Sequence, residues 1–139
     1  MEIEEPMKIK TTTIYVDDQE TALRFYTEVL GFVKKTDFSK GTYRWLTVAS
    51  AEDPDGTELQ LASNDNPAAK TFQQALAGQN QPAQQFFTED LQADYERMKS
   101  RGAEFSMPPT DVTGSKIAQL RDTVGNLIQL VQLQKWGQS

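Results

Sequence analysis

The chain repeats its own pattern once, and this duplication restricts the possible folds more than any other feature of the sequence. An Asp followed by an amphipathic segment occurs twice, at Asp18 and at Asp90, 72 residues apart. A Gly that ends such a segment also occurs twice, at Gly31 and at Gly102, 71 residues apart. Landmarks at nearly constant offsets indicate two copies of one structural unit.

Each copy is expected to contain one helix and four strands in the order β-α-β-β-β. Alternating or β-branched stretches predict the strands, and apolar residues at helical spacing before each Gly predict the helices. The expected strands are 8–16, 32–38, 41–50 and 57–63 in the first copy, and 84–87, 103–107, 114–122 and 125–133 in the second. We expect a turn at 52–56. Asp17 or Asp18 is expected to cap the first helix, and Asp17 with Glu20 resembles a capping box.

The predicted domain boundaries follow the repeat. We expect an acidic leader at 1–6, a first βαβββ module at 7–65, a short helix and linker at 66–81, a second module at 82–133 and a tail at 134–139. Asn66 and Pro67 are typical of a helix start. Phe72 and Leu76 are expected to form the apolar stripe of this helix, which ends at Gly78.

One helix can cover only one face of the sheet in its own module, so the other face of the sheet needs a partner. Two copies can place their open faces around a shared cavity. The sequence therefore predicts an α+β protein of eight strands.

Composition excludes several kinds of site. The chain has no histidine and no cysteine, which excludes histidine- or thiolate-ligated metal sites, Ser-His-Asp catalysis and disulfides. A net charge of −6 argues against nucleic acid as a partner and mildly favours neutral or cationic ligands. There is no apolar run of the roughly 20 residues needed to span a membrane. Without a recognisable signal peptide, the expected location is the cytoplasm.

The alternation of side chains along strands predicts which residues line the cavity. Gln60 and Gln129, at matching places in the two copies, both lie on the face away from the helix. The candidate ligand-binding residues are Thr11, Thr13, Tyr15, Trp45, Thr47, Glu58, Gln60, Gln85, Phe87 and Gln129. Aromatic surface with neutral hydrogen-bonding groups suits a small organic molecule. The alternatives are a half-exposed sheet with a polar outer face and, for Trp45, a place in the core.

These residues lie within motifs that resemble a known superfamily. The segment IYVDDQETALRFYTEVLGF (14–32) is similar to the signature of the vicinal oxygen chelate superfamily, which contains glyoxalase I, extradiol dioxygenases and bleomycin-resistance proteins. The strand entries DPDGTELQL and DTVGNLIQLVQL resemble its Asp-Pro-Asp-Gly-Asn pattern, from which Thr123 and Val124 depart. The resemblance covers about residues 7–133.

The resemblance implies two βαβββ modules that form an eight-stranded, incompletely closed barrel around a cavity, often in a homodimer. Metal-dependent members take His and Glu ligands from the first and last strands of each module. The corresponding positions here are Thr11, Ala83, Gln60 and Gln129, which bind transition metals poorly. Glu58 is the nearby carboxylate. We therefore expect no metal cofactor.

The sequence leaves three functions open. The first is metal-free binding that sequesters an antibiotic or metabolite. The second is an enzyme of the same superfamily, either a metal-dependent lyase, isomerase or dioxygenase with atypical ligands, or a metal-free enzyme with Glu58 as general base. The third is an interaction role with a filled cavity. Arg44, Lys116 and Arg121 are expected at the surface, and Tyr26 and Tyr95 in the core.

Overall fold

The structure is a computed structural model, and it describes residues 5–134. Most of the predicted tail, 135–139, and most of the predicted leader, 1–4, lie outside these residues. None of the helices described is long and apolar enough to cross a membrane.

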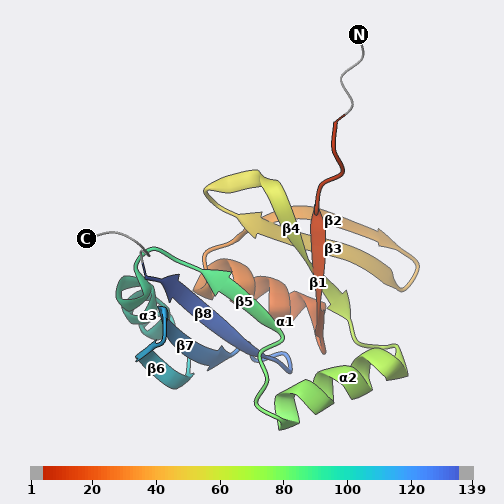
Figure 1. The fold of residues 1–139 in the computed structure, drawn as a ribbon. Coiled ribbons are helices and arrows are strands. Elements are labelled where there is room, and N and C mark those ends of the chain that lie inside the picture. Colours follow the sequence, from red (N-terminus) through yellow and green to blue (C-terminus); the bar gives the residue numbers. More distant parts are fainter. Residues whose placement is uncertain (1–4, 135–139) are drawn as a thin grey trace.

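Two four-stranded sheets form the framework of the molecule (Figure 1). The first sheet has the order β1-β4-β3-β2, and its strands are Thr11–Val16 (β1), Val33–Lys40 (β2), Tyr43–Ser50 (β3) and Asp53–Ser63 (β4). The second sheet has the order β5-β8-β7-β6, and its strands are Gln84–Phe87 (β5), Phe105–Val112 (β6), Ser115–Arg121 (β7) and Leu127–Leu133 (β8). In each sheet the first and last strands of the module pair in parallel, and the other pairs are antiparallel. The element order and the two sheets confirm the predicted α+β arrangement of two βαβββ units. The two sheets do not join into a closed barrel.

The helices begin where aspartates cap them. The helix α1 (Gln19–Arg24) continues into a π-helical turn, η1 (Phe25–Val29), and α3 (Leu91–Ser100) is its counterpart in the second half. Asp18 accepts a hydrogen bond from the amide of Thr21 at 3.0 Å, and Asp90 accepts one from the amide of Ala93 at 3.1 Å. Each bond satisfies one of the amides that a helix start leaves without a partner. The suggested capping box of Asp17 with Glu20 is wrong, because Asp18 is the cap and Glu20 pairs with Arg44.

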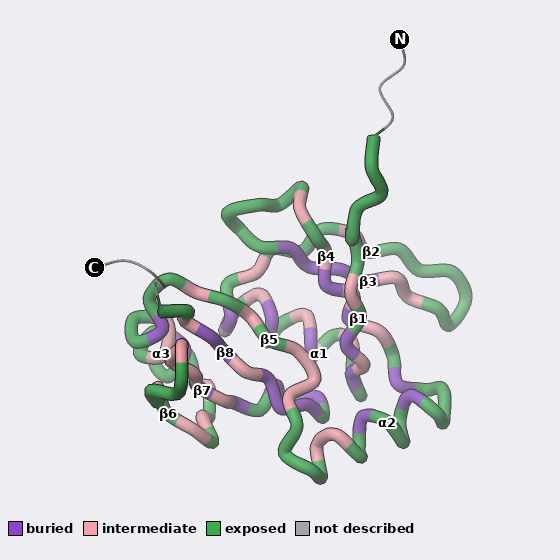
Figure 2. Tube along the Cα trace, in the orientation of Figure 1, coloured by how far each residue is buried: buried purple, intermediate pink, exposed green. Residues whose placement is uncertain are grey.

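One hydrophobic core lies between the sheets and is shared by α1, η1 and α3 (Figure 2). The helix-facing side chains of both sheets are buried in it, as the alternation along the strands predicts. The largest fully buried apolar side chains are Tyr26, Leu46, Leu61, Leu91, Leu120, Leu127, Ile128, Val16, Val48 and Val124. Tyr26 is therefore a core residue, whereas Tyr95 is only partly buried and packs edge-to-face on Phe105.

Three strands extend further than their patterns indicate. The expected turn at 52–56 is wrong, since β4 already begins at Asp53 and the chain reverses at residues 51–52. Main-chain pairing of Ser50 with Asp53 accounts for this early start. The strand β2 extends to Lys40 and β6 to Val112, beyond the expected 38 and 107.

The helix α2 (Pro67–Gly78) joins the halves. The face that it packs against the rest of the protein differs from the one that its apolar residues predict. Asn66 caps it by accepting a hydrogen bond from the amide of Ala68. The prediction that Phe72 forms part of its packing stripe is wrong, since Phe72 is 56% exposed. Ala69 and Gln73 are the buried residues of this helix, because the Gln73 amide has polar partners inside the protein.

A buried polar cluster connects the two halves through Asp122, which is fully inaccessible to solvent. Its Oδ2 accepts hydrogen bonds from the Tyr26 hydroxyl and from Nδ2 of Asn126, both at 2.7 Å. Its Oδ1 accepts from the amides of Val124 at 3.0 Å and Asn126 at 2.9 Å. Four donors therefore surround one carboxyl group that bridges the first helix and the β7–β8 turn.

Gln73 extends this cluster to β1 and to Asn64, the residue that follows β4. Its Nε2 donates to the carbonyl oxygens of Tyr15 and Val124, both at 2.9 Å, and its Oε1 accepts from Asn64 at 2.7 Å. Nδ2 of Asn126 also donates to the Tyr15 carbonyl at 2.8 Å. These contacts fix the end of β1, which carries Tyr15, relative to the second half.

Candidate ligand-binding faces

Each sheet has an outer face, which we define as the face directed away from the helices. On the first outer face, Gln60 of β4 lies between Thr13 of β1 and Thr47 of β3. On the second, Gln129 of β8 lies in the same way between Gln85 of β5 and Gln119 of β7. The duplication therefore places a polar row at the same position on both outer faces.

The three glutamines of the second outer face form a chain of hydrogen bonds. Nε2 of Gln119 donates to Oε1 of Gln129 at 2.8 Å, and Nε2 of Gln129 donates to Oε1 of Gln85 at 3.1 Å. Within the described residues, no acceptor is recorded for Nε2 of Gln85. The exposed end of the chain thus offers an amide donor to a ligand.

The polar row of the first outer face contains a carboxylate beside hydroxyl groups. Thr13 Oγ1 donates to Oε1 of Gln60 at 3.0 Å, and Thr47 Oγ1 donates to Oε1 of Glu58 at 2.6 Å. Lys10 Nζ lies 3.7 Å from Oε2 of Glu58, whose side chain is 13% exposed. Thr47 is fully buried, so its hydroxyl holds Glu58 in one orientation.

Aromatic and aliphatic side chains lie beside both polar rows. Trp45 of β3 pairs with Phe38 of β2, and Phe38 is 58% exposed. On the second sheet, Val131 of β8 lies between Phe87 of β5 and Ile117 of β7, and Phe87 is 63% exposed. Exposed rings adjoining amide and hydroxyl groups suit an organic ligand with polar edges.

The structure divides the predicted site residues between the two sheets. The first sheet carries Thr11, Thr13, Tyr15, Trp45, Thr47, Glu58 and Gln60, and the second carries Gln85, Phe87 and Gln129. They form two clusters on separate outer faces, and of these residues only Glu58 and Gln85 line the same cavity, the inter-sheet cleft described below. Sequence reasoning missed Phe38, Gln119, Ile117 and Val131, although the alternation of residues 114–122 already places Ile117 and Gln119 on one face.

The four positions at which the sequence resemblance predicts metal ligands have a donor set that does not fit a transition metal. Thr11 is exposed, and Ala83 has no donor atom in its side chain. The side-chain oxygens of Gln60 and Gln129 already accept hydrogen bonds. Across residues 5–134, no group of three or more His, Cys, Asp or Glu side chains comes together. Neutral amides and one hydroxyl are weak ligands for such ions.

Arg44 has a structural role that residue types alone leave open. Its guanidinium forms a bidentate pair with Asp37, at 2.9 and 2.8 Å, and bonds Glu20 at 2.8 Å. The Arg44 guanidinium lowers the pKa of the Asp37 carboxyl. Arg121 donates to Oδ1 of Asn80 at 3.0 Å. Neither cation belongs to the polar rows of the outer faces.

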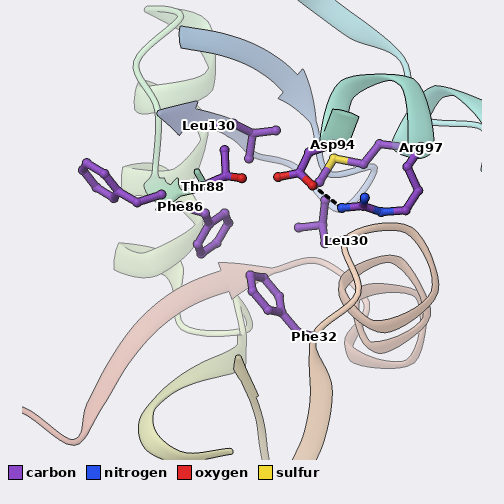
Figure 3. Close-up of a pocket in the computed structure, with 9 residues that line it drawn as sticks. Leu30, Phe32, Phe86, Thr88, Asp94, Arg97 and Leu130 are labelled. Carbon is purple, nitrogen blue, oxygen red and sulfur yellow. Dashed lines mark hydrogen bonds and ion pairs between the residues drawn. The ribbon is translucent and has the colours of Figure 1, made fainter. Parts of the chain in front are cut away.

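Two cavities lie where the halves meet. The larger one, here called the inter-sheet cleft, has a volume of about 190 Å³ and is lined by Thr12, Phe32, Val48, Ala49, Ser50, Thr57, Glu58, Leu59, Gln84, Gln85 and Phe86. The smaller one, of about 80 Å³, lies between the end of η1 and α3 (Figure 3). Phe32 and Phe86 approach each other on one side of it, and the ion pair of Asp94 with Arg97 lies on the other.

Fold and faces together define a paired βαβββ protein whose two sheets present matching polar and apolar rows. A family model of the Glyoxalase/Bleomycin resistance protein/Dioxygenase superfamily matches residues 8–130, and the chain belongs to this superfamily.

Relatives of similar length match nearly the whole chain, and two of them are solved structures with the same fold. The YurT protein of Bacillus subtilis (strain 168) is 48% identical over 126 residues, which span 91% of this chain and 99% of YurT. The crystal structure of UcmS2 matches with a TM-score of 0.78 at 30% identity, over 91% of this chain and 98% of UcmS2. TnmS3, described as an antibiotic binding protein from Streptomyces sp. CB03234, matches with a TM-score of 0.74 at 26% identity, over 95% of this chain and all of TnmS3.

Proposed function

We propose that the protein binds a small organic molecule without a metal ion, as a homodimer in which a second copy covers the outer faces. The observation that carries this proposal is the pair of matching rows, Thr13–Gln60–Thr47 and Gln85–Gln129–Gln119, each beside exposed rings. A binding site needs a large apolar contact area together with a few directional polar groups, and each outer face offers both.

The exposed rings support a covered site. Phe38, Tyr43 and Phe87 are each more than half exposed, and Leu133 is 60% exposed. Large apolar side chains gathered at a surface mark places where a ligand or another protein binds. Thr47 and Val131 on these faces are already buried, whereas the rings beside them are exposed, so a second copy that covers the rings also encloses the ligand.

The donor set supports metal-free binding. The four positions that correspond to metal ligands in metal-dependent relatives carry Thr11, Gln60, Ala83 and Gln129, and the chain has no histidine or cysteine anywhere. We therefore assign hydrogen bonding with the ligand to the amide groups and the exposed Thr13 hydroxyl, since the Thr47 hydroxyl is buried against Glu58. TnmS3, the antibiotic binding protein of the same fold, supports an antibiotic or a comparable metabolite as the ligand class.

A ligand screen with paired variants tests this function. We expect members of a panel of aromatic antibiotics and metabolites to raise the melting temperature, as any ligand selective for the folded state does. Trp45→Ala and Gln60→Leu should each weaken binding of the best compound at least tenfold, because they remove a ring and an amide from the first outer face. Phe72→Ala is the matched control, since Phe72 is an exposed ring on α2. Equal affinity in all three variants would refute an outer-face site.

A further inference from the structure

The inter-sheet cleft meets the outer faces at Glu58 and Gln85, but most of its wall comes from other residues. Val48 and Leu59 line it, and both belong to the helix-facing sides of β3 and β4. Thr47 and Gln60, their neighbours in sequence, point to the opposite side of the same sheet. We infer that this cleft is a second binding site, which takes a small neutral aromatic compound carrying a hydroxyl group.

The walls of the cleft are apolar and come from both halves of the chain. Phe32 and Phe86 meet edge-to-face with ring centroids 5.1 Å apart. Val48 has no exposed surface and Leu59 is only 7% exposed, so the two partly buried rings supply most of the accessible apolar wall. A surface of rings and branched side chains favours an aromatic ring over an elongated polar molecule.

The polar groups of the cleft define the chemistry of the ligand. Nε2 of Gln84 donates to Thr12 Oγ1 at 3.3 Å and to the Thr13 carbonyl at 3.2 Å. Its Oε1 has no recorded donor within residues 5–134, and it is therefore available to accept a hydrogen bond from a ligand hydroxyl. The carboxylate of Glu58 also lines the cleft, but it already accepts a hydrogen bond from Thr47 and pairs with Lys10. An uncharged ligand is expected, because a charge in an apolar cleft without a counter-ion loses its hydration.

The volume sets the size of the ligand. An apolar cavity of about 150 Å³ in another protein holds benzene. The cleft, at about 190 Å³, has room for one aromatic ring with a short substituent. Phenol is the simplest probe that combines the ring with the hydroxyl donor.

Phenol binding to the full-length protein, followed by two-dimensional amide NMR, tests the inference. We expect saturable shifts at the Gln84 side-chain amide and at the Ser50 backbone amide. Benzoate and benzylamine should bind at least tenfold more weakly, because each places a charge in the cleft. Gln84→Leu should weaken phenol binding at least fivefold through loss of the acceptor. Absence of saturation, or equal binding of benzoate, would overturn the inference.

A variant whose side chain blocks the entrance of the cleft provides a second test of phenol binding there. Ser50 lies at the rim of the cleft and is exposed, so Ser50→Trp should fill the entrance without disturbing the core and abolish phenol binding. Ser39→Trp is the matched control, at an exposed position of β2 outside the cleft. The best compound of the outer-face screen should bind both variants as it binds the wild type. Unchanged phenol binding to Ser50→Trp would contradict the second site and leave the outer-face proposal intact.

Discussion

The Tyr26 hydroxyl donates a 2.7 Å hydrogen bond to Oδ2 of Asp122, a residue 96 positions further along the chain, and both side chains are fully buried. This bond links the first helix to the β7–β8 turn and so fixes one half of the protein relative to the other. Burial raises the pKa of Asp122 from its usual value of 3.8, and the four hydrogen bonds it accepts oppose that rise.

Tyr26→Phe should lower the free energy of unfolding by about 1–3 kcal/mol, because Asp122 loses a donor while it stays buried. The effect depends on pH in a defined direction. With its pKa raised in the folded state, Asp122 contributes stability below pH 3.8 that is lost as pH rises through the folded value. Removal of the Tyr26 donor raises that pKa further, so the variant should lose more stability at pH 8 than at pH 4. Urea unfolding at several pH values measures this, with the exposed Tyr43→Phe as control. A pH-independent loss would contradict the role of Asp122.

Gly125→Ala should destabilise the protein more than Gly102→Ala. Both glycines have a positive φ, +106° and +95°, which costs alanine about 1–2 kcal/mol. A Cβ on Gly125 would lie 2.4 Å from Nε2 of Gln73, whereas one on Gly102 would meet nothing within 4 Å. We expect Gly125→Ala to cost about 1–3 kcal/mol more, since it displaces a buried amide from its partners. Equal melting temperatures for the two variants would show that Gln73 moves aside freely.

Thr47→Val tests the hydroxyl that orients Glu58. The substitution keeps the shape of a fully buried side chain and removes its 2.6 Å hydrogen bond to the carboxylate. We expect a loss of about 1.5–3 kcal/mol, the range for hydrogen bonds to charged groups. Thr13→Val removes the exposed 3.0 Å bond to Gln60 and should cost less than about 1 kcal/mol. Chemical denaturation of both variants distinguishes the two bonds, and the reverse order would contradict this account of Glu58.

Arg44→Lys should cost about 0.5–1 kcal/mol, because lysine cannot reproduce the bidentate contact with Asp37 at a partly exposed site. Arg44 lowers the pKa of Asp37, so this contribution is present above pH 3.8 and is lost as pH falls through the folded value of Asp37. The difference between wild type and variant should therefore shrink in acid, and it should also shrink in 0.5 M salt. Thermal unfolding at pH 7 and pH 3 is the appropriate measurement. A difference that persists in acid would contradict the ion pair as its source.

Local patterns were sufficient to predict much of the fold. Period-two alternation placed Gln60 and Gln129 away from the helices, and aspartates with helical spacing predicted α1 and α3. These signals depend on a few consecutive residues, which is why they can be read from one chain. The resemblance to the superfamily then supplied the pairing of the two modules.

The structural features that could not be predicted from the sequence depend on contacts between distant residues. Gln119 joins the polar row only through the register of β7 with β8, and Asp122 becomes a buried connector only because Tyr26 reaches it. The prediction that Phe72 packs inward is wrong because the neighbouring Gln73 has polar partners on β1 and on the β7–β8 turn. These partners determine which face of α2 packs against the protein. A long-range hydrogen bond of this kind outweighs the apolar pattern of one short helix.

Metal-free binding can be tested by measuring the affinity of the protein for the best compound of the screen. Calorimetry in excess EDTA is compared with calorimetry after addition of Zn²⁺, Mn²⁺ or Fe²⁺. We expect equal dissociation constants in all these conditions, since amides and hydroxyls bind the ligand. Protein purified without chelators should contain less than about 0.1 equivalent of transition metal. Binding that disappears in EDTA and returns with one of these metals would contradict metal-free binding.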